Sequence, residues 1–93
     1  MNTINDFLPT IERWAFTGDG LQTVLTLVPG DYELTALYGI VWWSATKILT
    51  ATTAATDGLP VPHSQTKGFK LLDGQQLYIY NPAGVDSYLR RVR

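Results

Sequence analysis

The chain contains no cysteine and only one histidine among its 93 residues. The absence of cysteine excludes disulfide bonds and thiolate metal sites, and one histidine excludes a multi-histidine metal site within one chain. A domain of this size buries only about two thirds of the surface of its unfolded chain, and small domains often gain stability from disulfides, metals or oligomerisation. Oligomerisation is the remaining source of added stability, so we expect a homo-oligomer, for example a trimer.

Long apolar runs and a secretion signal are also missing. No apolar stretch approaches the roughly 20 residues of a membrane span, and the first residues lack a basic region followed by an apolar run. The absence of cysteine fits an intracellular product or a particle assembled in a cytosol. We therefore expect no membrane partner.

Positive charge is scarce outside the end of the sequence. Of the seven basic residues, Arg90, Arg91 and Arg93 lie in the last four positions. The first 89 residues therefore carry four basic (7 − 3) and eight acidic side chains. A nucleic-acid-binding domain would show a basic face on its body. An acidic body with a basic end suits a protein partner better, so no nucleic-acid partner is expected.

Turn signals recur at short spacing and predict β structure. Pro29-Gly30, Asp57-Gly58 and Asp73-Gly74 supply the backbone conformations of tight turns. Short apolar runs between regular turns are typical of a sandwich or barrel. We predict an all-β fold over residues 1–93, a single domain that is a small antiparallel β-sandwich or a jelly-roll-like barrel.

Alternation of apolar and polar residues places the strands. In 31–38, Tyr32, Leu34 and Ala36 share one face, which indicates a half-buried strand. The predicted strands are 10–16, 21–28, 31–38, 46–52, 69–72, 76–80 and 87–93, with 69–72 and 76–80 joined as a hairpin. Residues 1–9 are predicted as an N-terminal arm or a single helical turn, because Pro9 would break a longer helix there. Residues 53–67 are predicted as a long loop, a feature that is usually functional or mobile.

Trp42 and Trp43 are adjacent, so on a strand they point to opposite faces. Both can be covered, one by each layer. Alternatively, one anchors a protein interface, where tryptophan is enriched, or one forms a sugar-stacking platform with Tyr78 or Tyr80. The candidate interface residues from this aromatic set are Trp42, Trp43 and Tyr80.

The basic end has three interpretations. Arg90, Arg91 and Arg93 can form a solvated terminus, or they can dock onto an acidic neighbour. Arginine suits such docking because its planar guanidinium binds carboxylates through two hydrogen bonds. Nucleic-acid contact is the third and the least favoured, because three charges give weak, salt-sensitive binding. These three residues complete the set of candidate interface residues.

No catalytic, cofactor-binding or metal-binding residue is expected. His63 follows two prolines in the predicted loop, and no serine stands in a nucleophile elbow such as G-x-S-x-G. The Asp-Gly pairs lack the D-x-D-x-D-G spacing of a calcium loop. Gly18-Asp19-Gly20 is too short for a phosphate-binding loop. We therefore predict that the chain is not an enzyme.

Several phrases occur in an order that resembles small β-sandwich virion structural proteins of tailed bacteriophages, especially head decoration (cementing) proteins. The phrases are FTGDG (16–20), PGDY (29–32), TKILT (46–50), FKLLDG (69–74), LYIY (77–80) and LRRVR (89–93). The similarity spans 16–93 and is one of pattern. The aromatic stretch 38–43 stands where that pattern has a small, Gly-rich linker.

The resemblance implies a structural protein that binds the major capsid protein shell, in a virion assembled in the bacterial host cytoplasm. A tail or head–tail connector component has the same kind of sequence. A carbohydrate-binding adhesion module is the alternative from a different class, and it needs exposed aromatic platforms. The exposure of Trp42, Trp43, Tyr78 and Tyr80 distinguishes a glycan module from a shell protein.

Overall fold

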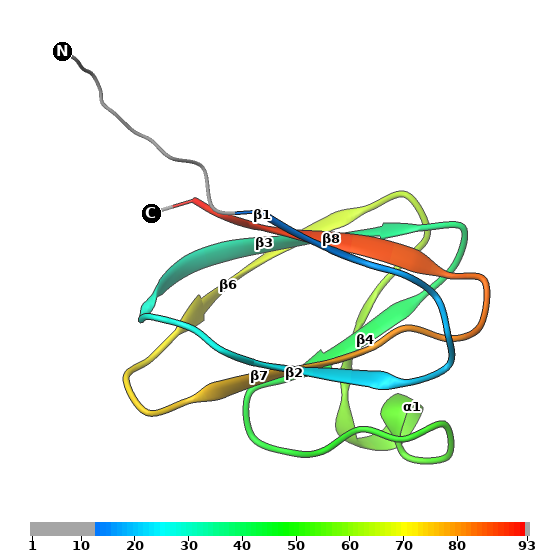
Figure 1. Cartoon of the computed structure of the whole chain (residues 1–93), viewed down its shortest axis with the longest axis horizontal. Helices are drawn as coiled ribbons and strands as arrows, with labels where there is room; N and C mark the ends of the chain where they lie inside the picture. The colour runs from blue at the N-terminus through cyan, green and yellow to red at the C-terminus, as the bar shows by residue number, and fades with distance from the viewer. Residues whose placement is uncertain (1–12, 93) are drawn as a thin grey trace, which may run out of the picture.

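The computed structural model describes residues 13–92, which form two facing layers of antiparallel strands (Figure 1). The elements are β1 (Arg13–Phe16), β2 (Gln22–Thr26), β3 (Gly30–Leu37), β4 (Val41–Ser44), α1 (Ala54–Asp57), β5 (Leu59–Val61), β6 (Thr66–Leu71), β7 (Gln76–Tyr80) and β8 (Asp86–Arg91). One sheet has the order β1-β8-β3-β6 and is called the β3 sheet here; the other has the order β2-β7-β4-β5 and is called the β7 sheet. The predicted all-β sandwich is confirmed.

The core lies between the two sheets and follows the alternation of the strands. Tyr32, Leu34 and Ala36 of β3 are buried on one side, and Leu77 and Ile79 of β7 are buried on the other. Every second residue of a strand points to the same face. The same alternation therefore turns the intervening residues of β3 and β8 to the outer face of the β3 sheet.

Two turns at one end of the sandwich are locked together. The backbone N–H of Gly18 donates to Oδ1 of Asp86 over 2.7 Å, and the N–H of Gly84 donates to the carbonyl of Gly18 over 2.8 Å. The N–H of Gly20 donates to the carbonyl of buried Asn81 over 3.0 Å. These bonds fix the connection β1–β2 against the connection β7–β8.

The strand predicted at 46–52 is wrong. β4 ends at Ser44, whose Oγ accepts hydrogen bonds from the backbone N–H groups of Thr46 (3.1 Å) and Lys47 (3.0 Å). A side-chain acceptor that binds the following N–H groups turns the chain instead of extending it. The segment 45–58 then passes over the outer face of the β7 sheet.

The long loop predicted at 53–67 is also wrong, because it contains α1, β5 and the start of β6. β5 pairs with β4 as the edge strand of its sheet, with Pro60 opposite Trp42. Proline is tolerated at a sheet edge because its missing N–H leaves no gap in the hydrogen-bond ladder. Pro60 thus lies in an edge strand, not in a loop, and Pro62 follows the end of that strand.

The other predicted strands correspond to observed ones. β2, β3 and β8 lie in the predicted ranges within one residue, and the hairpin of β6 and β7 turns at Gly74, where φ is 83°. The strand predicted at 10–16 is described from Arg13 onward. The predicted arm at 1–9 lies outside the described residues.

Candidate protein-binding surface

The two adjacent tryptophans are half-buried and belong to different layers. The Trp43 ring lies in the main core and stacks on Phe69, with ring centroids 4.1 Å apart and an interplanar angle of 21°. Trp42 points to the opposite face and packs against a separate buried cluster of Leu49, Ala54 and Tyr80. Of the interpretations open from the sequence, the structure favours the one in which each tryptophan is covered by its own layer.

Tyr80 was predicted as an interface residue, and the structure corrects this assignment. Only 8% of Tyr80 is exposed, because the segment 45–58 places Leu49 and Ala54 over it. The side-chain carbonyl of Gln22 accepts a hydrogen bond from the Leu49 N–H and fastens this segment to β2. The sequence could not show this cover, because the segment reads as a strand followed by a loop.

The arginines at the end of β8 do not all face the same way. Arg90 lies on the outer face of the β3 sheet, where its Nη2 donates to Oε1 of Glu33 over 2.6 Å. Arg91 is half-buried, and its Nη2 lies 3.4 Å from the carbonyl oxygen of Pro29. Arg93 lies outside the described residues.

The structure adds Arg13, which the sequence analysis missed. Strand pairing places Arg13 of β1 directly opposite Arg90 of β8. The Arg13 guanidinium lies over the Tyr88 ring, 5.0 Å from its centroid. These residues come from opposite ends of the sequence, so only the strand register brings them together. Arg13, Arg90 and Arg91 are called the arginine end below.

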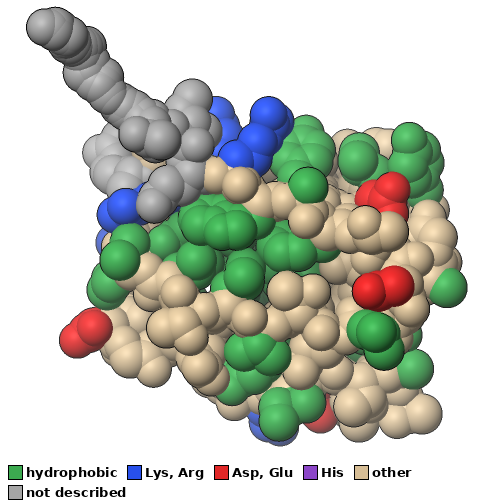
Figure 2. All heavy atoms as spheres, viewed as in Figure 1, with side chains coloured by type: hydrophobic (Ala, Val, Ile, Leu, Met, Phe, Trp, Pro, Cys, Tyr) green, Lys and Arg blue, Asp and Glu red, His purple; other side chains and the backbone are tan. Residues whose placement is uncertain are grey.

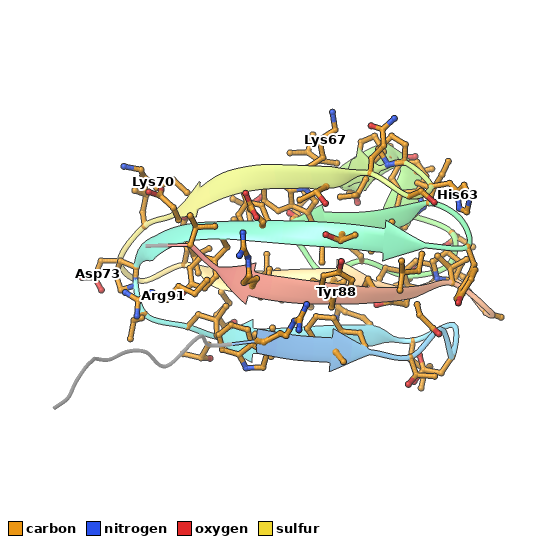
Figure 3. The ribbon with its side chains drawn as sticks, turned by 90° about the horizontal axis from the view of Figure 1, so that it is seen from above. His63, Lys67, Lys70, Asp73, Tyr88 and Arg91 are labelled. Atoms are coloured by element: carbon orange, nitrogen blue, oxygen red, sulfur yellow. The ribbon has the colours of Figure 1, made fainter. Side chains whose placement is uncertain are left out.

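The outer face around the arginine end is open. In the described part of the chain no segment crosses the β3 sheet on this side (Figure 3). The hydroxyl oxygens of Thr35 and Thr66 lie 2.7 Å apart across β3 and β6. Beside them, a shallow hollow of about 330 Å³ opens at Gly68, which has no side chain to fill it. This face can receive a protein surface but offers no enclosed site for a small molecule.

A second hollow lies on the opposite sheet, at the end near the β6–β7 turn. It has a volume of about 610 Å³. The Tyr78 hydroxyl donates to Oε1 of Gln76 over 3.1 Å, and Nε2 of Gln76 donates to Oγ1 of Thr26 over 3.2 Å. Asp73, Thr46 and Gln75 add to its polar lining. Tyr78 is half-buried against the Leu49 cluster, so its ring is not an open platform.

In the described part of the chain, the residue types that support catalysis or metal binding do not cluster. His63 Nε2 lies 3.2 Å from the hydroxyl of its neighbour Ser64, and both residues are exposed. Within residues 13–92, no three His, Asp or Glu side chains come together as metal ligands. The same residues contain no helix of sufficient length and apolarity to cross a membrane. The absence of enzyme activity stays a prediction.

Fold and surface together define a small β-sandwich with an open, arginine-bearing sheet face. Comparison with protein-family models, curated proteins and solved structures finds no match to this chain. The resemblance to virion proteins therefore stays a prediction.

Proposed function

We propose that this chain is a structural protein of a tailed-bacteriophage virion, of the capsid decoration type, and that it binds the major capsid protein shell. It attaches through the outer face of the β3 sheet. The observation that carries the proposal is the arginine end, where Arg13 and Arg90 lie side by side on an open sheet face. The order of sequence phrases described above supports the virion as its setting.

Two arginines directly opposite each other on a sheet repel and destabilise it. Here the Arg90 charge is balanced by Glu33, and Arg13 gains a cation–π contact with Tyr88. A carboxylate on a partner can bind the Arg13 guanidinium through two hydrogen bonds. The pair is thus suited to orient the chain on an acidic surface and to speed its association.

Trp42 and Trp43 have a smaller part in this proposal than the sequence suggested. Both are half-buried by the chain itself. Apolar contact with the shell would instead come from the outer face of the β3 sheet, where Tyr88 and Leu37 are partly exposed. A tail or connector component would use the same kind of face, so its place in the particle must be found by experiment.

Co-sedimentation tests the proposed surface. Virus particles from the strain that encodes the chain, prepared with its gene deleted, are mixed with purified protein and pelleted. We expect the wild-type chain to pellet with the particles, and binding to weaken as salt rises. The double variant Arg13→Gln, Arg90→Gln should bind at least about tenfold more weakly, which corresponds to about 1.4 kcal/mol.

A matched control removes two charges elsewhere. The variant Lys67→Gln, Lys70→Gln changes two exposed residues of β6 at the far edge of the same sheet, and it should bind like the wild type. Equal weakening by both variants would mean that only net charge matters. Full binding by the arginine variant would show that the arginine end is a solvated terminus.

The glycan alternative rests on one observation, the polar hollow lined by Thr26, Gln76 and Tyr78. Carbohydrate sites combine polar groups with an open aromatic ring, and the Tyr78 ring is half-covered. We therefore expect no saturable binding on a broad glycan array. Specific binding that Gln76→Ala abolishes, with the fold intact by circular dichroism, would favour the glycan module instead.

A further inference from the structure

The sandwich has two open sides, each formed by the edge strands of the two sheets. β6 and β5 are edges on one side, and β1 and β2 are edges on the other (Figures 1 and 3). An edge strand exposes unpaired N–H and carbonyl groups that can pair with another chain. Proteins that stay monomeric block such edges with lysine, proline or very short strands.

One side carries these protective features. β6 bears Lys67 and Lys70, both exposed, and they point away from the sheet at its edge (Figure 3). β5 has only three residues and contains Pro60. A second chain that approached this side would meet two positive charges and a proline that cannot donate a hydrogen bond.

On the opposite side, β1 has only four residues and bears exposed Arg13, but β2 lacks such features. β2 (Gln22–Thr26) has no charged residue, no proline and no glycine. Its central residue, Val24, is 46% exposed, and the residues that flank the strand, Leu21 and Val28, are also exposed. Figure 2 views the molecule from the side of β1 and β2, and hydrophobic side chains are visible there between the sheets. An uncharged edge strand with exposed apolar residues is suited to pair with another strand.

We propose that β2 pairs antiparallel with β2 of a second copy of the chain, about a two-fold axis at Val24. Val24 then lies opposite its own copy, and Gln22 lies opposite Thr26. One step outward, Leu21 lies opposite Leu27. Apolar residues thus meet at Val24 and at Leu21 and Leu27, and an amide meets a hydroxyl at Gln22 and Thr26. Thr23 lies opposite Leu25, and no like charges face each other.

The occupant is a second copy because the strand fits itself better than β6 could. Two β6 strands would bring Lys67 and Lys70 of both copies together, whereas two β2 strands bring together no charge at all. The pairing joins two β7 sheets into one continuous sheet and produces a two-fold dimer, not the trimer considered from the sequence. It leaves the outer face of the β3 sheet free, so it is independent of the proposed function.

Cysteine cross-linking tests the register, and the wild-type chain has no cysteine that could interfere. Residues directly opposite across an antiparallel pair have Cβ atoms about 4.5–5.5 Å apart, close to disulfide range. Under mild oxidation Val24→Cys should run as a covalent dimer on a non-reducing gel. The control Lys67→Cys, on the protected edge, should stay monomeric under the same conditions.

The mass in solution provides the second arm. Light scattering after size exclusion should give twice the chain mass of 10.3 kDa for the wild type. Val24→Lys places two ammonium groups at the axis and should yield monomers, while Thr66→Lys on β6 should remain dimeric. If Val24→Lys does not fold, the cross-link alone decides. Three results would overturn the proposal. The first is a wild-type monomer at about 100 μM, and the second is a trimer. The third is a dimer that Val24→Lys leaves intact and that Val24→Cys does not cross-link.

Discussion

Gly18 stands at a point where a side chain has no room. A Cβ atom at this position would lie 2.2 Å from the backbone nitrogen of Val85 and 2.6 Å from its carbonyl oxygen. Backbone atoms cannot move aside as a flexible side chain can. Gly18 also holds the turn before β8 through its hydrogen bonds to Asp86 and Gly84. The glycine is therefore required by packing.

We expect Gly18→Ala to destabilise the fold by about 1–3 kcal/mol or more, the usual range for overpacking. The matched control is Gly68→Ala, since a Cβ there would meet only the Tyr32 carbonyl at an ordinary 3.7 Å. That variant should be neutral or slightly stabilising, because alanine restricts the unfolded chain more than glycine does. Urea unfolding of both variants measures the difference, and equal stabilities would show that the two turns are not locked as described.

Tyr38 has a left-handed backbone with φ of 70°, and 71% of its surface is exposed. A bulky residue in this region costs about 1–2 kcal/mol, and no burial of its ring offsets the cost. Asparagine adopts this conformation far more readily. Tyr38→Asn should therefore raise the free energy of unfolding by about 1 kcal/mol. Tyr38→Phe keeps the strain and should change nothing; a destabilised Tyr38→Asn would mean that the ring contributes to the fold.

At the scale of elements, the segment 45–58 acts as a cover for the β7 sheet. It contributes Leu49 and Ala54 to the cluster around Trp42 and Tyr80. This cover explains why Tyr80 is buried and Trp42 is half-buried. A function that needs the rings of Trp42 and Tyr80 in solvent would require the segment 45–58 to move off the sheet.

Two adjacent residues of the segment test whether it is part of the folded core. Leu49 is 1% exposed and Ile48 is 64% exposed. Leu49→Ala should lower the free energy of unfolding by about 2–5 kcal/mol, and Ile48→Ala by less than about 0.5 kcal/mol. Thermal unfolding followed by circular dichroism compares them. A Leu49→Ala variant as stable as the wild type would mean that the segment does not pack on the sheet.

Local patterns were sufficient to predict some elements and not others. The alternation around Tyr32 and Leu34 and the Asp73-Gly74 turn predicted β3 and the hairpin of β6 and β7, since period and turn chemistry are local properties. The stretch 46–52 also alternates, yet the Ser44 hydroxyl captures the following N–H groups and turns the chain. The alternation of apolar and polar residues does not show whether a backbone N–H bonds to a side chain or to a neighbouring strand.

At the scale of the whole molecule, the sandwich follows from composition and turn spacing, but the candidate surface depends on register. Arg90 stood out because it lies in a basic run. Arg13 did not, because its position opposite Arg90 is set by the pairing of β1 with β8. Likewise, Tyr80 is buried by a segment far from it in sequence. Long-range pairing decides which side chains share a surface, and a single sequence does not encode it locally.

The central claim is that the chain is a structural component of a virus particle. Quantitative mass spectrometry of virus particles, purified by density gradient from the strain that encodes the chain, tests it most directly. We predict that the chain co-purifies with the particles at a fixed ratio to the major capsid protein, near one copy per shell subunit or a simple fraction of it. Its absence from particles that contain all other structural proteins, or a level no higher than that of trapped host proteins, would contradict the account.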